Sequence, residues 1–241
     1  MAEWSKREHS KRTIKNAGYL LAGRLAYNAD AIEAFRIAHN WRMAHAYPMM
    51  RERVLLSRAC SGAGDTAGRI KRMDSIRKKL RRSSITLDSI QDLAGIRAIL
   101  PDMDAVASVV AKYQAGYGQS TIRRVDDYIT SPKSGGYRSI HLIRSFAGGG
   151  HGENYRGQRV EIQIRTRLQH VWATAVEAVG AVRGEDLKAG EGSRDWLRLM
   201  ELMSANFATL EGQPVGGYVQ VSKAERLEEC KRDVAPLCGE A

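Results

Sequence analysis

The first quarter of the chain has a helical pattern of hydrophobic and polar positions. Between residues 13 and 58 there is no proline before Pro48, and apolar residues recur at spacings of three and four, which is the period of an amphipathic helix. The apolar positions of this pattern are Ile14, Tyr19, Leu21, Leu25, Ile32, Phe35, Ile37 and Trp41. We predict two amphipathic helices here and part of a third at residues 54–56.

Strand patterns begin near residue 95. The segment Gly95–Leu100 alternates in character and ends at Pro101, which predicts a strand. Three further strands are predicted over Ile122–Ile129, Arg138–Phe146 and Arg159–Arg165. The last two flank the glycine-rich segment Ala147–Gly157, a connector suited to a hairpin.

The remaining segments predict helices around a small mixed sheet. Ser61–Gly68 has the composition of a loop. Helices are predicted over Arg69–Arg82, Leu87–Leu93, Asp102–Tyr113, Arg167–Arg183 and Ser193–Leu210, with Asp102 or Asp104 as the cap of the third. We expect one domain of class α/β (α+β). Its segments are an N-terminal helical extension (1–60), a core (61–183) and a C-terminal helical and acidic extension (184–241).

Composition excludes several classes of protein. The 241 residues are 43% hydrophobic and 27% charged, so low complexity is excluded. No run reaches the about 18 uncharged apolar residues that a membrane span requires, and the charged start MAEWSKREHSKR does not resemble a signal peptide. Cys60, Cys230 and Cys238 lack disulfide or zinc-ligand spacing, so we expect free thiols and a cytoplasmic protein.

The charge is unevenly distributed along the chain. The net charge is +11, with +6 in residues 1–60 and −4 in residues 184–241. A basic body predicts a polyanionic partner, which includes nucleotide phosphates, RNA, DNA or an anionic surface. A solvated basic surface without a partner fits the same charge.

Two polar blocks near the middle of the chain suit a nucleotide and its metal. On a predicted helix, Lys71, Ser75 and Lys79 fall on one face and form a stripe of donors for a triphosphate. Asp92 precedes a predicted strand that carries Arg97, and carboxylates with substrate phosphates are the usual ligands of Mg²⁺. A solvated basic helix, and a capping Asp with a surface Arg, are the structural alternatives.

Two further blocks interrupt the later strands. The loop Pro132–Gly136 carries Lys133 and is followed by Tyr137 and Arg138, so it suits phosphates and a stacked base if Tyr137 is exposed. A hairpin with Tyr137 in the core fits equally well. In the last predicted strand Glu161, Gln163 and Arg165 alternate with apolar residues, and such a polar face is costly unless it lines a liganded cleft. Asp92 and Glu161 would then share one Mg²⁺.

Three motifs resemble the synthetase domain of the RelA/SpoT family. They are Asp92-Leu-Ala-Gly-Ile-Arg97, the segment Asp127–His141 with its Pro-Lys and Gly-Tyr-Arg-Ser, and Val160-Glu-Ile-Gln-Ile-Arg-Thr166. Gln169–Thr174 is similar to the following helix of the small, single-domain members. The resemblance covers about residues 65–183. It implies a nucleotidyltransferase-like mixed sheet and an ATP pyrophosphokinase, which transfers the β,γ-pyrophosphate of ATP to a ribose 3′-hydroxyl.

The resemblance also implies a role for each site residue. On the ATP side Arg69 and Arg97 would sandwich the adenine, and the phosphates would be held by Lys71, Ser75 and Lys79. Asp92 would bind Mg²⁺, and Glu161 would help with the metal or activate the acceptor hydroxyl. On the acceptor side Tyr137 would stack on the base, near three residues for the phosphates, Lys133, Arg138 and His141. Gln163 and Arg165 are secondary candidates.

The acceptor is not fixed by the resemblance. GDP or GTP, giving (p)ppGpp, is the first expectation, and toxin-like members of the family would act on the 3′-CCA end of tRNA or on adenosine nucleotides. A non-catalytic nucleotide- or RNA-binding module is the alternative from another class. We see no His-Asp pair of the kind the family's hydrolase half uses, so we expect a synthetase only. An antitoxin protein is a further expected partner, and the chain is also expected to associate with copies of itself as a homo-oligomer. Gly135 stands where the family often has a polar residue, which affects the detail of acceptor binding.

Overall fold

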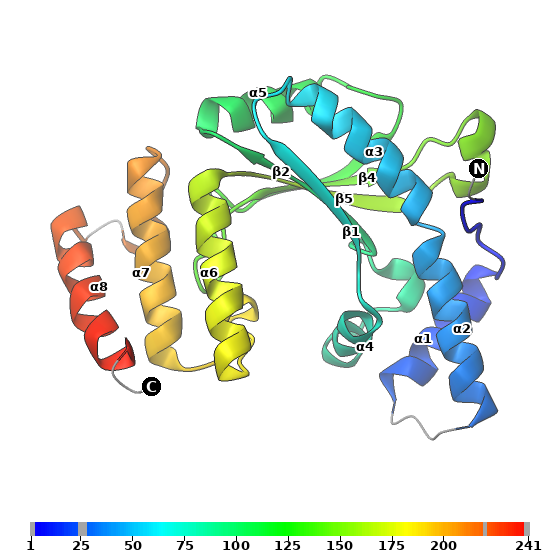
Figure 1. Cartoon of the computed structure of the whole chain (residues 1–241), viewed down its shortest axis with the longest axis horizontal. Helices are drawn as coiled ribbons and strands as arrows, with labels where there is room; N and C mark the ends of the chain where they lie inside the picture. The colour runs from blue at the N-terminus through cyan, green and yellow to red at the C-terminus, as the bar shows by residue number, and fades with distance from the viewer. Residues whose placement is uncertain (1–2, 24–27, 219–220, 239–241) are drawn as a thin grey trace. The chain divides into compact units, whose positions relative to one another are not determined.

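A five-stranded sheet forms the centre of the fold (Figure 1). The structure, a computed structural model, describes residues 3–23, 28–218 and 221–238, without the side chains of residues 218 and 234–238. The strand order is β1-β2-β5-β4-β3. The strands are β1 (Asp65–Ile70), β2 (Ala94–Leu100), β3 (Thr121–Asp127), β4 (Ile140–Ser145) and β5 (Arg159–Thr166). The predicted class, a mixed sheet flanked by helices, is confirmed.

Eight α-helices are described, most of them at the predicted positions. They are α1 (Lys11–Ala22), α2 (Ala29–Met43), α3 (Ala46–Ala59), α4 (Met73–Arg82), α5 (Met103–Gln114), α6 (Arg167–Arg183), α7 (Arg194–Leu210) and α8 (Lys223–Cys238). Short 3-10 turns lie at η1 (Leu87–Ser89), η2 (Gly150–Tyr155), η3 (Leu187–Ala189) and η4 (Gly216–Tyr218). The Asp102 carboxylate accepts from the Ala105 N–H at 2.8 Å, as predicted for a cap. Leu25 lies outside the described residues.

The predicted boundary between loop and helix near residue 69 is wrong. The second half of the predicted loop is the edge strand β1, and α4 begins only at Met73, with Arg72 at its N-cap. Gly68 explains the strand, since a Cβ there would lie 3.2 Å from Ile96 Cγ2 and 3.4 Å from Met49 Sδ. Glycine thus allows β1 to pack closely against β2 and α3, where composition alone suggested a turn.

The chain forms two compact units whose segments interleave. The first contains Met1–Ala98, Ala111–Val125 and Leu142–Gln163, and the second contains Ile99–Val110, Asp126–His141 and Ile164–Ala241. The division into three consecutive segments, 1–60, 61–183 and 184–241, is a different kind of division and stays a prediction.

In the first unit, α1, α2 and α4 pack around an apolar cluster. The buried members from the three helices include Ile14, Leu21, Ala34, Trp41, Ile76 and Leu80. Full burial of one such aliphatic side chain stabilises the fold by about 1.5–3 kcal/mol. Ser10 and Asn28 cap α1 and α2 by accepting from the backbone N–H groups of Thr13 and Ala31. The predicted N-terminal helices are confirmed.

His45 is a buried neutral base between α2 and α3. Only 1% of the residue is exposed, and its Nδ1–H donates to the Trp41 carbonyl at 2.8 Å. Burial lowers the pKa of His45 to about 4. The unfolded chain therefore binds a proton below pH 6.5 that the folded chain does not bind until about pH 4.

We expect the unfolding free energy to fall by about 3 kcal/mol as the pH is lowered from 7 to 4, since one pKa unit corresponds to about 1.4 kcal/mol. The expected measurement is urea unfolding at several pH values for the wild type and for His45→Gln. The variant, although less stable at pH 7, should lose much less stability across this window. Equal pH slopes for the two proteins would show that His45 does not govern the effect.

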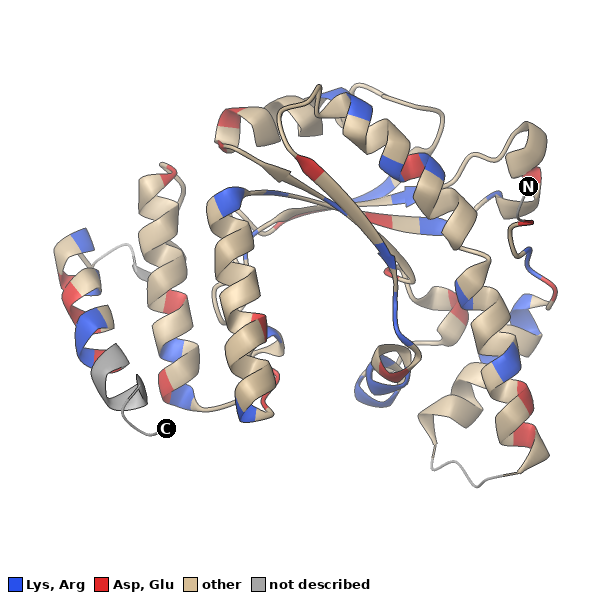
Figure 2. Ribbon diagram, viewed as in Figure 1, with Lys and Arg blue, Asp and Glu red and all other residues tan. Residues whose placement is uncertain are grey.

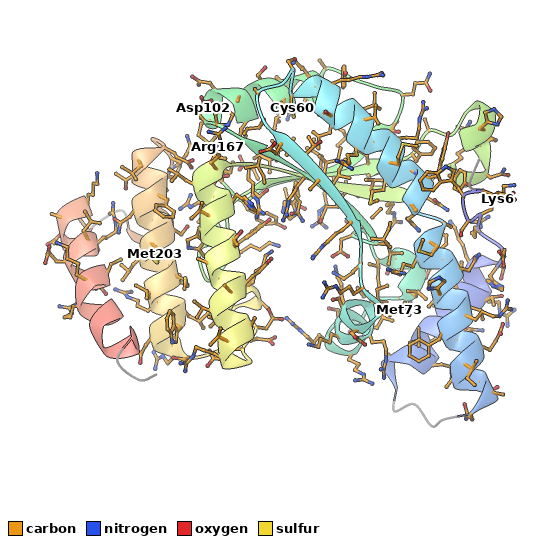
Figure 3. The ribbon with its side chains drawn as sticks, in the orientation of Figure 1. Lys6, Cys60, Met73, Asp102, Arg167 and Met203 are labelled. Carbon is orange, nitrogen blue, oxygen red and sulfur yellow. The ribbon has the colours of Figure 1, made fainter. Side chains whose placement is uncertain are left out.

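In the second unit, α6, α7 and α8 lie side by side (Figure 1). Figure 3 labels Arg167 at the start of α6 and Met203 on α7. Thr166 caps α6 by accepting from the Gln169 N–H, and the Trp172 indole donates to the Met200 carbonyl of α7 at 2.8 Å. These bonds tie the helix that follows β5 to the C-terminal helices.

Two remaining predictions concern cysteines and membranes. Cys60 is buried and Cys230 is partly buried, and both are free thiols, as expected. The side chain of Cys238 is outside the described residues. Among the helices that the structure describes, none combines the length and the apolar character that a membrane crossing requires.

Candidate active site

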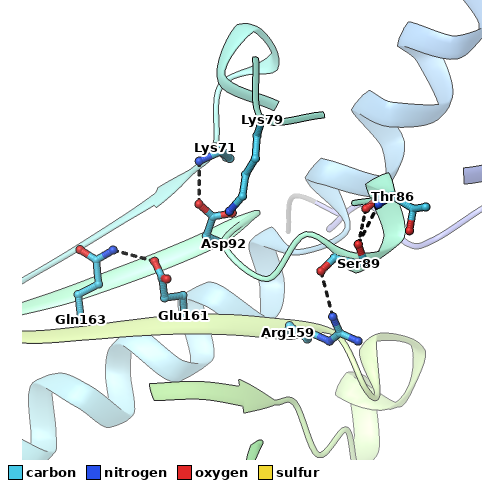
Figure 4. A network of polar contacts seen from close by, with 8 residues as sticks. All are labelled: Lys71, Lys79, Thr86, Ser89, Asp92, Arg159, Glu161 and Gln163. Carbon is cyan, nitrogen blue, oxygen red and sulfur yellow. Dashed lines mark hydrogen bonds and ion pairs between the residues drawn. The ribbon is translucent and has the colours of Figure 1, made fainter. Parts of the chain in front are cut away.

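A carboxylate held between two lysines is the central feature of the first unit (Figure 4). Asp92 Oδ2 lies 2.7 Å from Lys71 Nζ, and Asp92 Oδ1 lies 2.9 Å from Lys79 Nζ. The Asp92 side chain is 20% exposed, so the group is shielded but reachable from solvent. In such an arrangement the two ammonium groups can bind an anionic ligand and the carboxylate can bind a cation, in place of the ion pairs between them.

Three different elements bring these residues together. Lys71 follows β1, Lys79 lies on α4, and Asp92 precedes β2. The Lys71 N–H donates to the Leu93 carbonyl at 2.9 Å, which fixes the two backbone segments side by side. The predicted single helical stripe is therefore wrong for Lys71, although Lys71 and Lys79 do converge. Ser75 lies on α4, one turn before Lys79, and is partly buried.

The two lysines determine the ionisation of Asp92. Burial would raise the pKa of the Asp92 carboxyl, but the charges and hydrogen bonds of Lys71 and Lys79 outweigh it, so the pKa is lowered. The carboxylate is thus ionised at neutral pH, which is the form that binds a metal ion.

Strand β5 presents a second carboxylate. Val160, Ile162 and Ile164 are fully buried, while Glu161 and Gln163 are only partly buried. This confirms the predicted alternation of the two faces. Gln163 Nε2 donates to Glu161 Oε2 at 2.7 Å, and the two side chains point to the same side of the ribbon as Asp92 in Figure 4. Because β5 is the neighbour of β2, the acids are presented from adjacent strands.

The other predicted residues of the ATP side lie on the first two strands of the sheet, β1 and β2. Arg69 is exposed on β1, and Arg97 is partly buried on the adjacent strand β2. Arg165, in contrast, is 2% exposed and its Nη2 lies 2.8 Å from His170 Nδ1. Arg165 is thus a buried member of the second unit, where it contacts α6.

In the second unit, Lys133, Tyr137 and His141 form one aromatic and cationic cluster. Tyr137 is 3% exposed, so the exposure expected for stacking is not found and the alternative, a core tyrosine, describes its position. The Tyr137 hydroxyl lies 2.8 Å from His141 Nε2. Lys133 Nζ lies 4.1 Å from the ring centroid of Tyr128 and 5.5 Å from that of Tyr137.

Tyr128 is a residue that the sequence reasoning missed. It is partly exposed, and its ring also packs edge-on against His141 at 5.1 Å. The signal in the sequence was the position of Tyr128 in the Asp127-Tyr-Ile motif, directly after two acidic residues at the end of the predicted strand. Tyr128, with the Lys133 ammonium over it, is the more accessible aromatic ring of this cluster.

Arg138 is bound within the fold. It is 4% exposed, and it donates to the Ile129 carbonyl at 2.5 Å and to Ser204 Oγ at 3.0 Å. Burial lowers the pKa of the Arg138 guanidinium from its usual value. Its role near an acceptor phosphate stays a prediction, and its present contacts shape the loop that precedes β4.

The carboxylates of this site suit a Mg²⁺ ion that also binds substrate phosphates, and they are too few to enclose a metal ion by themselves. Within the described parts of the chain, no group of three or more His, Cys, Asp or Glu side chains could hold a metal ion. Mg²⁺ typically uses one or two carboxylates and completes its shell with substrate phosphates and water. Asp92 and Glu161 match that requirement, while Lys71 and Lys79 are paired with Asp92 in this structure.

Basic side chains line the helix that carries Lys79. Figure 2 shows Lys and Arg along α4, and the exposed ones from its N-cap onward are Arg72, Lys78, Arg81 and Arg82. Arg81 donates to the carbonyls of Ala22 and Gly23 at the end of α1. The remaining cations extend the positive surface beyond the lysines that contact Asp92.

Comparison with known proteins finds a family match for the part of the chain that contains these residues. Residues 68–180 match the family described as "Region found in RelA / SpoT proteins". The GTP pyrophosphokinase YjbM of Bacillus subtilis is 36% identical over 113 residues, which cover 44% of this chain and 51% of that protein. The GTP pyrophosphokinase of Escherichia coli K12 is 30% identical over 140 residues, which cover 54% of this chain and 17% of that protein. The matched segments thus span about half or less of these relatives.

Solved structures confirm the fold. The small alarmone synthetase 1 of Bacillus subtilis, solved with its product pppGpp, superposes with a TM-score of 0.61 at 24% identity, covering 72% of this chain and 92% of that one. At this identity the likeness establishes the common fold. The family match includes Asp92, Tyr137 and Glu161, so residues 68–180 of this chain are a region of the kind found in RelA/SpoT proteins.

Proposed function

We propose that the chain is an ATP-dependent pyrophosphokinase that transfers the β,γ-pyrophosphate of ATP to the 3′-hydroxyl of GDP or GTP. The bond between the β-phosphorus and the bridging oxygen of the α-phosphate breaks, and AMP leaves. The observation that carries the proposal is Asp92, held by Lys71 and Lys79 at the start of β2. The pyrophosphokinase names of the relatives and the pppGpp bound to the B. subtilis synthetase support the choice of reaction and acceptor.

On the donor side, ATP replaces the internal ion pairs. Lys71 and Lys79 leave Asp92 and bind phosphate oxygens, and Ser75 is placed on α4 to donate a further hydrogen bond. Arg69 and Arg97, on adjacent strands, hold the adenine between their planar guanidinium groups. The lysines thus neutralise the charge that repels an attacking oxygen.

The carboxylates divide two tasks. Asp92 and Glu161 would hold Mg²⁺, which when bound to the phosphates supplies additional neutralisation of their charge. Glu161 Oε atoms also accept the proton of the acceptor 3′-hydroxyl, which is a poor nucleophile while protonated. Gln163 orients the Glu161 carboxylate through its 2.7 Å hydrogen bond.

The acceptor is assigned to the cluster in the second unit. Lys133 supplies positive charge and His141 an imidazole nitrogen for the nucleotide phosphates, and Tyr128, with Tyr137 packed against it, supplies the aromatic surface for the base. Arg138 supports the loop from within. Tyr137 is buried, so it supports the partly exposed ring of Tyr128 instead of stacking on the base itself.

A second acceptor is favoured by the basic surface. The exposed cations of α4 and the net charge of +6 in residues 1–60 exceed what one triphosphate needs. Such a surface suits a polynucleotide backbone, so the 3′ end of tRNA is the alternative acceptor of the same reaction.

The test is transfer of label from γ-labelled ATP with Mg²⁺ to GDP, GTP, ATP or deacylated tRNA, each offered separately to the purified chain. We expect labelled guanosine tetra- or pentaphosphate on thin-layer plates. Label in tRNA alone would replace the acceptor and keep the reaction. Folded protein that transfers to none of the four would contradict the proposal and favour a nucleotide-binding module.

A further inference from the structure

The loop that carries Lys133 and Tyr137 is bound along its backbone by α7. The Gly135 N–H donates to Glu201 Oε1 at 2.9 Å, and Ser204 Oγ donates to the Gly136 carbonyl at 2.5 Å. Arg138 Nε in turn donates to Ser204 Oγ at 3.0 Å. Glu201 and Ser204 are three residues apart and therefore share one face of α7. Two side chains of one helix thus bind the backbone of two consecutive loop residues.

The two glycines are required for this approach. Gly135 and Gly136 have φ values of +84° and +89°, a conformation that other residues rarely adopt. A Cβ at Gly136 would lie 2.7 Å from Ser204 Cβ and 3.2 Å from Glu201 Cα. The Gly-Gly pair of the motif therefore fits against α7, where a larger residue would push the loop away.

The same C-terminal region contacts the Tyr137 ring. Lys188 Nζ, from η3, lies 5.4 Å from the ring centroid and 2.5 Å from Glu177 Oε1. Met200 of α7 belongs to the apolar cluster around Tyr137. Lys188, Met200 and the two loop-binding residues of α7 all follow residue 180, where the family match ends.

We propose that Glu201 and Ser204 are positioning residues that hold the loop Pro132–Tyr137 in its acceptor-binding conformation. The segment beyond the family match would then be part of the acceptor site. This inference rests on the proposed function, because it takes the loop as the place where GDP or GTP binds. A free loop with two glycines would lose much conformational entropy at each binding event. Ordering it in advance improves affinity.

Glu201→Ala tests the inference, with two matched controls. Glu201→Gln keeps an oxygen that accepts from Gly135, and Asp195→Ala removes an exposed acid from the same helix. The measurements are the Kd of GDP by calorimetry, the KM values for GDP and ATP, and hydrogen exchange of a peptide covering residues 131–137. Ser204→Ala, checked for folding by its Tm, removes the second contact.

For Glu201→Ala we expect about a tenfold rise in the Kd and KM of GDP. This is the effect expected from the loss of one charge-assisted hydrogen bond. The KM for ATP should change less than about twofold, and the loop peptide should exchange faster. Glu201→Gln and Asp195→Ala should resemble the wild type.

Unchanged exchange or unchanged GDP affinity in Glu201→Ala would overturn the positioning role, and so would tighter GDP binding, which would mean that α7 restrains the loop. If the wild type bound GDP but transferred nothing, the proposed reaction would fail. The tenfold loss of GDP affinity in Glu201→Ala would still establish the role of α7.

Discussion

Asp92→Asn is expected to lower the rate of pyrophosphate transfer by about 10³-fold while the chain stays folded. The substitution removes the charge that Lys71 and Lys79 contact and that we assign to Mg²⁺, but it keeps the side-chain volume. Loss of one such electrostatic group from a catalytic site lowers the rate by about 10²–10³-fold. We expect a reduction at the upper end of that range, measured as kcat with saturating ATP and GDP.

Binding of metal-free ATP distinguishes this role from general damage. In the wild type, ATP must break two ion pairs and approach a carboxylate, whereas in Asp92→Asn the lysines are released for the phosphates. The variant should therefore bind ATP without Mg²⁺ at least as tightly as the wild type, measured by calorimetry in EDTA. Added Mg²⁺ should strengthen binding less than in the wild type.

The control is Asp74→Asn, which neutralises an exposed acid in the first turn of α4. It should transfer pyrophosphate at nearly the wild-type rate. Full activity in Asp92→Asn would remove Asp92 from the catalytic group. Weaker binding of metal-free ATP would mean that Asp92 only maintains the local fold.

The sequence was sufficient wherever local periodicity determines structure. The alternation of β5 predicted that Glu161 and Gln163 lie opposite three buried apolar residues, and the structure agrees. The bounds of α6 follow from its pattern, with a capping Thr166 and with Gly184 at φ +70° after its last turn. Such elements are specified by neighbours within one or two turns.

The sequence was insufficient where a contact joins distant residues. The edge strand β1 was missed because Gly68 is explained by packing against Ile96 and Met49, not by a turn. The burial of Tyr137 depends on packing against α6 and α7. The bonds from α7 to Gly135 and Gly136 span 66 and 68 residues. No pattern within a short window contains such information.

Another long-range contact, the ion pair between Arg144 and Glu52, should contribute strongly to the stability of the first unit. Arg144 of β4 and Glu52 of α3 are each 1% exposed and pair at 2.5 Å. Ser120 Oγ donates to the other Glu52 oxygen at 2.6 Å, and Arg144 Nη2 donates to the carbonyls of Tyr117 and Ser120. The network joins a helix, a loop and a strand that lie up to 92 residues apart.

Arg144→Met is expected to lower the unfolding free energy by about 3–5 kcal/mol, because it leaves the Glu52 carboxylate buried without its cation. The measurement is urea unfolding at pH 7. The same change at Arg156, whose ion pair with Glu153 is more than half exposed, should cost far less, because exposed ion pairs contribute little to stability. This pair therefore controls for the loss of an arginine as such.

The double variant Glu52→Leu with Arg144→Met identifies the source of the loss. It removes the stranded charge, and buried ion pairs can often be replaced by apolar residues at little cost. We therefore expect the double variant to be more stable than Arg144→Met alone, although the carbonyls of Tyr117 and Ser120 still lack their donor. If the losses of the two single variants simply add, the charges are not coupled. The penalty would then lie in the backbone contacts of Arg144, and the pair would be a consequence of the packing between α3 and β4, not its cause.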